Sequence, residues 1–321
     1  MKRVLALAAI ALALSPIAAR AQAFPTKPIK IIVPFVAGGS SDIVARAIGS
    51  KFQEILGQPA IVENKPGANG AIAAEFVAKA EPDGYTILVG SIGVFSINTA
   101  LFKDLRYNPL RDFVPITLAV TTPNVLVTKP DMPVATMKEL VEYAKKNPDK
   151  LSYCSSGTGS SDHLTGEVFK QTAGTTAVHV PYKGGAACQT DLMGGQVDYS
   201  FQNLGAVTSY IKAGRMKALA VTANARNPQL PNVPSAPEAG FPDLVVTSWQ
   251  AVVAPAKTPR DIVMKLNDAI VRTLKSPDVR ERLNQIGFDV VAGTPEEFGQ
   301  FMKAEVERWT LVVERGGIKT E

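Results

Sequence analysis

Residues 31–42 read IIVPFVAGGSSD, and residues 151–162 read LSYCSSGTGSSD. Both stretches start with an apolar run typical of a buried strand and continue with glycines and hydroxyl residues typical of a loop. The residues that follow repeat apolar side chains at helical spacing. Gly-Ser-Ser-Asp stands at both junctions, at 39–42 and at 159–162. The sequence therefore predicts two matching strand–loop–helix units, which we call the first corner and the second corner.

The rest of the chain continues this alternation. We predict strands at 29–35, 61–62, 85–89, 151–154, 178–182, 197–201 and 219–222. We predict helices at 42–56, 71–80, 136–147, 161–172 and 185–193, further helix starts at Thr258, Ser276 and Thr294, and an irregular connection at 227–242. Such alternation favours an α/β fold with mostly parallel sheets, which bind ligands beyond the carboxyl ends of their strands.

The two corners suit a small anion. Glycines let the backbone approach a ligand closely, N–H groups at a helix start attract a carboxylate or phosphate, and hydroxyls add donors. Neither corner contains Lys or Arg, so we favour a carboxylate over a polyphosphate. Two such corners could hold the ends of a dicarboxylate, or both could be ordinary caps and turns. A third loop, 181–185, carries Lys183, either as a cation near the site or as a solvated lysine.

The composition excludes several classes of protein. A chain of 321 residues with 46% hydrophobic and 20% charged residues is typical of a globular protein that is long enough for two lobes. Two cysteines and two histidines are too few for a disulfide-dense scaffold, a four-cysteine zinc site or a histidine metal cluster. We expect no metal and no cofactor. Cys154 and Cys188 could form a disulfide or remain two buried thiols.

The N-terminus has the order of segments found in a secretory signal peptide. Residues 1–3 are basic at two positions, 4–14 form an apolar run, and Ala21-Gln22-Ala23 is a cleavage site. We expect cleavage after Ala23, with Ala21 as the alternative. This removes three basic residues and no acidic one, so the net charge falls from +5 to +2. With no basic patch left, nucleic acid is an unsuitable partner.

Catalysis has weak support in the sequence. Ser160 or Ser161 with His163 could form the nucleophile and base of a secreted hydrolase, although a capping or core histidine is the more common role. No G-x-S-x-G motif and no paired-histidine metal motif is present. We therefore expect a binding protein, with the serine hydrolase as the alternative.

Seven segments together resemble a known family. They are 31–42, Glu-Asn-Lys-Pro-Gly-Ala-Asn-Gly (63–70), Pro-Asp-Gly-Tyr-Thr-Ile-Leu (82–88), 151–161, His-Val-Pro-Tyr-Lys-Gly-Gly (179–185), Gly-Gly-Gln-Val-Asp (194–198) and 230–242. The chain is similar to the Bug family, the periplasmic receptors of tripartite tricarboxylate transporters.

The resemblance implies a two-lobed, type II Venus-flytrap fold with a hinge of crossing strands. Residues 24–123 and 248–321 would form the first lobe, and 124–247 the second. It implies a monomer in the periplasm of a Gram-negative cell that delivers a carboxylate to membrane permease subunits. A ligand sensor without a transport role remains an alternative.

The resemblance also implies the ligand-binding residues. In the first lobe they are Phe35, Gly38, Gly39, Ser40, Ser41, Asp42, Ser91 and Asn98; in the second they are Ser155, Ser156, Gly157, Thr158, Ser160, Ser161, His163, Tyr182, Lys183, Gln202 and Asn203. The family commonly has Phe-Asp-Asn where this chain has Phe201-Gln202-Asn203. The missing carboxylate would be a natural partner for a ligand ammonium, so a di- or aromatic carboxylate is favoured over an amino acid.

Overall fold

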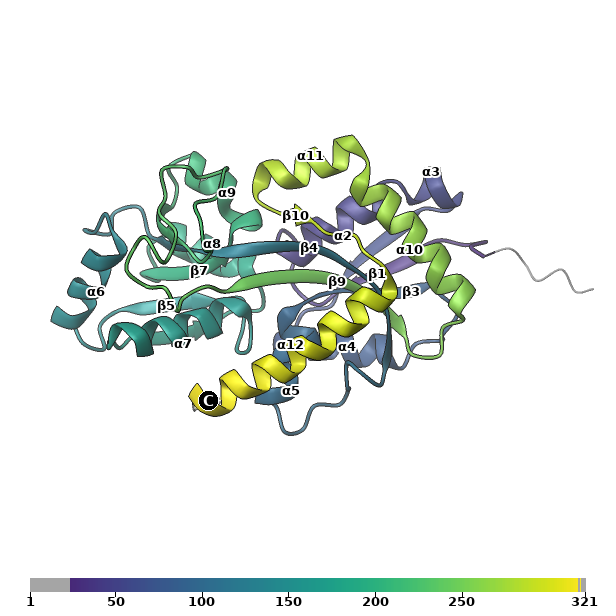
Figure 1. The fold of residues 1–321 in the computed structure, drawn as a ribbon, viewed down its shortest axis with the longest axis horizontal. Coiled ribbons are helices and arrows are strands. Elements are labelled where there is room, and N and C mark those ends of the chain that lie inside the picture. The colour runs from purple at the N-terminus through teal and green to yellow at the C-terminus, as the bar shows by residue number, and fades with distance from the viewer. Residues whose placement is uncertain (1–23, 317, 319–321) are drawn as a thin grey trace, which may run out of the picture.

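A computed structural model describes residues 24–316 and residue 318. The proposed signal peptide lies outside these residues. The strands form one connected sheet in the order β2-β1-β3-β9-β4-β7-β5-β6, with β8 and β10 also paired to β4. Figure 1 shows an elongated molecule in which β4 and β9 run through the middle, between two groups of shorter strands and helices. No helix in the described part of the chain is long and apolar enough to span a membrane.

The first group of strands is parallel and carries the first corner. It comprises β1 (Ile29–Val33), β2 (Ala60–Asn64) and β3 (Thr86–Ser91). The helices after these strands are α2 (Ser40–Gly49), α3 (Phe52–Leu56), α4 (Ala71–Ala78) and α5 (Asn98–Leu101). The sequence predicted one helix over 42–56, but the backbone leaves helical geometry at Lys51, between α2 and α3. The predicted stop at Gly57 is present, with this glycine in the left-handed conformation at φ 75°.

The second group carries the second corner and has the same organisation. It comprises the parallel strands β5 (Ser152–Ser155), β6 (Val178–Pro181) and β7 (Tyr199–Asn203). The helices are α6 (Met137–Lys146), α7 (Ser161–Ala173), α8 (Gly185–Met193) and α9 (Leu204–Lys212), and β8 spans Lys217–Val221. The bounds of α8 are those predicted, whereas α9 was not predicted.

Two long antiparallel strands join the groups. β4 (Phe113–Thr128) pairs with β9 (Thr247–Pro255) over its first part and with β7 and β8 over its last part. Among the described residues, all five antiparallel pairs involve β4 or β9, while the pairs within each group of shorter strands are parallel. These two strands were absent from the pattern analysis, and they correspond to the crossing strands that the family resemblance implied.

The C-terminal helices pack on the first group and along the middle of the molecule (Figure 1). They are α10 (Arg260–Lys275), α11 (Pro277–Ile286) and α12 (Pro295–Gly316), with the short strand β10 (Asp289–Val290) between the last two. On α12, the buried carboxylate of Glu305 accepts hydrogen bonds from the indoles of Trp249 and Trp309, at 2.8 and 3.1 Å. These contacts fix α12 against β9, so both crossing strands have a buried core on this side.

Candidate functional site

The two corners line a single pocket, although about 120 residues separate them in the sequence. We call it the corner pocket. Four further elements contribute to it: β3, α8, the junction of β7 with α9, and β9. The lining residues are Phe35, Gly39, Ser40, Ser41, Ser91, Ser156, Ser160, Ser161, Asp162, Gly185, Gln189, Gln202, Asn203, Ala206, Ser248 and Gln250.

In the first corner, the Asp42 carboxylate holds the glycine loop in place through hydrogen bonds. Its carboxylate accepts hydrogen bonds from Gly38 N at 2.9 Å, Arg46 Nε at 2.9 Å and Asn64 Nδ2 at 3.0 Å. Burial opposes the charge, but these donors together keep the pKa of Asp42 below its ordinary value. Gly38, at φ 86°, turns the chain so that its N–H faces this carboxylate. Gly38 and Asp42 thus shape the corner without lining the pocket.

The hydroxyls of the first corner make no hydrogen bonds to the part of the protein that the structure describes. Gly39, with extended backbone, is the N-cap of α2, and no side chain caps this helix. Among the described residues, neither the Ser40 nor the Ser41 hydroxyl has a hydrogen-bond partner, and both serines line the pocket. Their hydroxyls and the first backbone N–H groups of α2 are therefore available to an anion.

In the second corner, Asp162 has the corresponding role with different partners. Its carboxylate accepts a hydrogen bond from Ser156 N at 2.9 Å, another from the Ser156 hydroxyl, and further bonds from Ser161 Oγ at 3.1 Å and Gln202 Nε2 at 3.3 Å. No cation lies within ion-pair distance of this carboxylate in the described chain, and burial raises the pKa of Asp162. Sequence reasoning did not include Asp162 among the binding residues, although its place in Gly-Ser-Ser-Asp matched that of Asp42.

The side chains of Gln202 and Asn203 close the far wall. Gln202 Oε1 accepts from Gln189 Nε2 at 3.0 Å, and Gln202 Nε2 donates to Ser200 Oγ at 2.9 Å. Asn203 Nδ2 donates to Ser161 Oγ at 3.2 Å and to Asn124 Oδ1 at 2.6 Å. Both predicted residues therefore line the pocket as members of a connected amide network.

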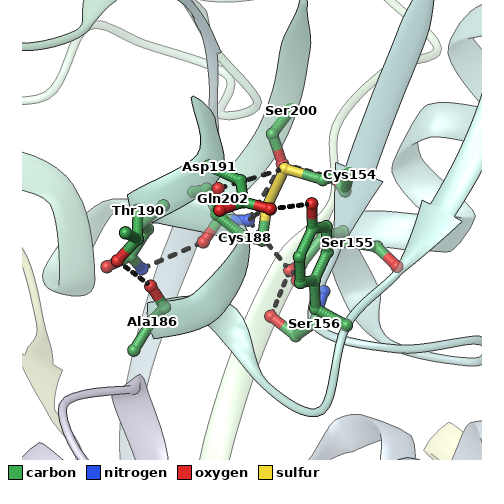
Figure 2. Close-up of a disulfide and its surroundings, with 12 residues drawn as sticks. Cys154, Ser155, Ser156, Ala186, Cys188, Thr190, Asp191, Ser200 and Gln202 are labelled. Atoms are coloured by element: carbon green, nitrogen blue, oxygen red, sulfur yellow. Dashed lines mark hydrogen bonds between the residues drawn. A yellow bond between two sulfur atoms is a disulfide. The ribbon is translucent and has the colours of Figure 1, made fainter. Parts of the chain in front are cut away.

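A disulfide lies behind the second corner. Cys154 and Cys188 are bonded, which settles the question that the sequence left open. Figure 2 shows this bond between β5 and α8, with Gln202, Ser200, Ser155 and Ser156 around it. Gln202 Nε2 lies 3.1 Å from Cys188 Sγ, and both sulfurs are fully buried. The bond ties the strand that leads into the second corner to the helix that carries Gln189.

His163, predicted to contact the ligand, lies outside the corner pocket and supports the glycine loop of the second corner. His163 Nδ1 accepts a hydrogen bond from Gly159 N at 3.1 Å, and its ring stacks on His179 with centroids 4.2 Å apart. His179 Nε2 and Ser155 Oγ are hydrogen-bonded at 2.7 Å, and Ser155 is fully buried. Burial lowers the pKa of His163 to about 4 and that of His179 to about 3. Neither His163 nor Ser155 lines the corner pocket.

The geometry required of a serine hydrolase is missing at the proposed serines. Ser160 Oγ accepts from the backbone N–H of His163 at 3.2 Å, as the N-cap of α7. In the part of the chain that the structure describes, neither the Ser160 nor the Ser161 hydroxyl bonds to the His163 ring. Since a nucleophile needs its base within hydrogen-bond reach, these residues do not form a catalytic pair in this conformation.

The remaining predicted residues divide between a second cavity and the protein interior. An adjoining space of about 270 Å³, which we call the distal compartment, is lined by Gly157, Thr158, Tyr182 and Lys183. Phe35 and Ser156 line both spaces. Asn98 lines neither, because it is buried against Asn69 and Tyr107.

Sequence reasoning also missed the contribution of β9. Ser248 and Gln250 of this strand line the corner pocket, and Gln250 Oε1 is a buried acceptor with no hydrogen-bond partner in the described ranges. Their alternate positions along one strand were a possible signal, but the strand itself was not predicted. Among residues 24–316, no group of three or more His, Cys, Asp or Glu side chains could hold a metal ion.

Comparisons with known proteins agree with this architecture. The family profile described as "Tripartite tricarboxylate transporter family receptor" matches residues 44–318. A UPF0065 protein from the tcbD-tcbE intergenic region of Pseudomonas sp. (strain P51) is 41% identical and covers 96% of this chain and 93% of its own length. Protein BugT of Bordetella pertussis is 36% identical and covers 99% of both chains.

Solved structures give the same result. Periplasmic binding protein BugD superposes with a TM-score of 0.90 at 37% identity, covering 93% of this chain and 100% of that chain. R. palustris Rpa4515 with adipate has a TM-score of 0.89 at 36% identity, covering 92% and 99%. MatC from Rhodopseudomonas palustris with bound malate has a TM-score of 0.87 at 35% identity, covering 90% and 100%.

These matches extend over nearly the whole chain and confirm the periplasmic-binding-protein fold, so this protein belongs to the tripartite tricarboxylate transporter receptor family, which includes the Bug proteins.

Proposed function

We propose that this protein is a periplasmic receptor that binds a small carboxylate between two lobes and delivers it to the permease of a tripartite transporter. The proposed lobes are residues 24–123 with 248–321, and residues 124–247. The observation that carries the proposal is the meeting of the two Gly-Ser-Ser-Asp corners in one pocket. Each corner aims the first N–H groups of a helix at the same space, and such groups bind anions.

The donors of the corner pocket suit a carboxylate better than a polyphosphate. Ser40 and Ser41 offer free hydroxyls, and no Lys or Arg is found among the lining residues that the structure describes. Gln250 Oε1 adds an acceptor, which a bridging water or a ligand hydroxyl would satisfy. Rpa4515 with adipate and MatC with bound malate support the same ligand chemistry, because both are relatives with a small dicarboxylate.

Within carboxylates, we propose a di- or aromatic carboxylate rather than an amino acid. Gln202 stands where an aspartate would pair with a ligand ammonium, and its amide is already bonded to Gln189 and Ser200. Asp162 lines the pocket, but it accepts four hydrogen bonds from the protein, and its raised pKa reduces its value as an ion-pair partner. An ammonium group would therefore be buried without a good counter-charge.

Ligand-induced thermal stabilisation tests the proposal. We expect malate, succinate, adipate and benzoate to include at least one compound that raises the melting temperature, because a ligand of the native state stabilises it by mass action. Calorimetry would then measure the affinity. Matched amino acids, such as aspartate, should bind at least about tenfold more weakly. The absence of any carboxylate ligand would contradict the proposal, and tighter binding of the amino acids would contradict the narrower ligand class.

Two serine variants test the site. Ser41→Ala should weaken carboxylate binding about fivefold to tenfold, because it removes a donor to a charged group. Ser209→Ala, at an exposed serine of α9, is the matched control and should leave the affinity unchanged. Equal affinities of the two variants would place the ligand elsewhere.

Transport should require both this protein and the membrane subunits in the same cell, and uptake that persists without this receptor would contradict its delivery role.

A further inference from the structure

Asp162 is the one ionisable side chain among the lining residues of the corner pocket that the structure describes. It is 2% exposed, and no Lys, Arg or His in the described lining offers a counter-charge for a second anion. We propose that the pocket binds a carboxylate together with one proton held on Asp162, so that ligand binding is proton-linked. This inference rests on the proposed function, because the ligand carboxylate is taken to lie in the corner pocket.

Two ionised carboxylates in this pocket would repel each other. Asp162 accepts hydrogen bonds from neutral donors, in contrast to Asp42, which Arg46 Nε contacts at 2.9 Å. Buried like charges raise each other's pKa, so that one of the two carboxyl groups holds a proton. Burial already raises the pKa of Asp162 without a ligand. Since free N–H groups and hydroxyls favour the ionised form of the ligand, the protein carboxyl is the group that takes up the proton.

The hydrogen bonds of Asp162 determine which of its oxygens takes the proton. Oδ2 accepts from Ser156 N at 2.9 Å, from the Ser156 hydroxyl, and from Gln202 Nε2 at 3.3 Å. Oδ1 lies 3.1 Å from Ser161 Oγ, whose hydroxyl donates to it. Because three donors already occupy Oδ2, the proton joins Oδ1, where Ser161 Oγ is the acceptor at hydrogen-bond distance.

Protonation of Asp162 turns the Ser161 hydroxyl into a donor for the ligand. While Asp162 is ionised, this hydroxyl donates to Oδ1 and accepts from Asn203 Nδ2 at 3.2 Å, so its proton is used within the protein. Once Oδ1 carries a proton, that O–H donates to Ser161 Oγ, which has two acceptor positions. The hydroxyl proton of Ser161 is then available to the pocket that this serine lines. Asp162 is therefore a positioning residue that acts through Ser161.

Other ionisable side chains stand on the elements around Asp162, but none of them is among the described lining residues. They are Asp42 and Arg46 on α2, Tyr153 on β5, His163, Glu167 and Lys170 on α7, His179 on β6, Tyr182 and Lys183 after β6, Asp191 on α8, Tyr199 on β7, and Tyr210 and Lys212 on α9.

These neighbours do not take over the role of Asp162. The sequences of β3, β4 and β9 contain no ionisable residue. Burial keeps His163 and His179 neutral above their lowered pKa values of about 4 and about 3. Glu167 accepts from Lys170 Nζ at 2.7 Å, and the remote Asp191 accepts from a tyrosine hydroxyl. Asp162 is thus the group whose charge a ligand in this pocket changes directly.

Proton uptake and the pH dependence of affinity test the inference. Calorimetry of the full mature chain with malate, succinate, adipate and benzoate, in phosphate and in Tris, gives the number of protons bound with each carboxylate, because the two buffers have different heats of ionisation. Titrations from about pH 7 to about pH 9 give the affinities in a range where these carboxylates are ionised.

Two variants separate Asp162 from other titrating groups. Asp162→Asn keeps the shape of the side chain, can donate an amide N–H to Ser161 Oγ as the protonated carboxyl would, and takes up no proton. Asp289→Asn is the matched control, because Asp289 of β10 also has a pKa raised by desolvation but lines neither the corner pocket nor the distal compartment.

We expect the wild type to take up about one proton with its ligand and to lose affinity by up to about tenfold per pH unit over this range. Asp162→Asn should take up no proton, keep its affinity within about twofold, and bind at least about tenfold more tightly than the wild type near pH 9. Asp289→Asn should behave like the wild type.

A wild-type affinity that stays constant from about pH 7 to about pH 9 would overturn the inference alone, and this result needs no variant to fold. A pH dependence that survives in Asp162→Asn would overturn it as well. Failure of every carboxylate to bind would overturn the proposed function too.

Discussion

The two corners contain the same four residues but use them in different registers. In the first corner the helix begins at Ser40, after an N-cap glycine, and no side chain caps it. In the second corner the helix begins one position later in the motif, at Ser161, and the Ser160 hydroxyl is the cap. Among the described residues, the first corner therefore leaves its hydroxyls without a partner, whereas the second uses one to stabilise its own helix.

The aspartates of the corners differ in the same way. Asp42 is balanced by the guanidinium of Arg46, whereas Asp162 has only neutral donors around it. The second corner compensates with a disulfide and a stacked histidine pair behind its loop. The comparison shows that the same motif can be stabilised by an ion pair in one corner and by a disulfide and stacked rings in the other. Variants of these groups measure how much each contributes to stability.

Removing the disulfide should have the largest effect. The double variant Cys154→Ser, Cys188→Ser opens a link between residues 34 positions apart, and chain entropy predicts a loss of about 4 kcal/mol in unfolding free energy. Urea unfolding measures the loss. The sequence contains no other cysteine, so the variant introduces no thiol side reaction. An unchanged unfolding free energy would show that packing alone holds the second corner.

Acid should have the second-largest effect, a loss of unfolding free energy caused by the histidines of the second corner. The native pKa of His163 is lowered to about 4 from 6.5, so the unfolded chain binds protons first, and stability is lost as the pH falls between these values. The loss should reach about 3 kcal/mol for His163 near pH 4. His179, with its pKa lowered to about 3, should add to the same trend.

Unfolding experiments over this pH range would measure the slope. His163→Asn retains an acceptor for Gly159 N and cannot be protonated, so its profile should be flatter than that of the wild type. Parallel profiles would mean that other groups cause the acid sensitivity.

The two aspartates should contribute to stability with opposite pH dependence. Asp42→Asn removes a charged acceptor from Arg46, which is half-exposed, so we expect a loss of about 1 kcal/mol near neutral pH. The contribution of Asp42 is present above its ordinary pKa and is lost as the pH falls through its lowered native pKa.

Asp162 has a raised native pKa, so its contribution is present below the ordinary value and is lost as the pH rises through the native one. Asp162→Asn should therefore be less destabilising at neutral pH than Asp42→Asn. Thermal unfolding of both variants gives the comparison, and a larger loss for Asp162→Asn would show that its charge is needed to hold Ser156.

Serine variants should give the smallest and sharpest contrast. Ser160→Ala removes the cap of α7 and should lower the unfolding free energy by about 1 kcal/mol. Ser40→Ala removes no internal hydrogen bond, so stability should change by less than about 0.5 kcal/mol while carboxylate affinity falls. Comparable losses of stability in both variants would refute the register difference.

Much of the fold could be predicted from local patterns. The starts of α6, α7 and α8, the stop at Gly57 and the irregular connection at 227–242 depend on caps, glycine conformations and apolar spacing within a few residues. Local patterns did not predict the long strands β4 and β9. These strands are buried along nearly their whole length, so they lack a clear alternation of apolar and polar residues.

The sequence by itself determined that two glycine-serine loops would each connect a strand to a helix and present neutral donors. Only the tertiary structure decided that these loops line one pocket, that Cys154 and Cys188 are bonded, and that Gln250 and Asn69 each bury a side-chain oxygen without a hydrogen-bond partner among the described residues. The physical reason is distance along the chain: caps and turns are set by neighbouring residues, whereas a shared pocket and an orphaned acceptor depend on how remote segments are packed by the crossing strands.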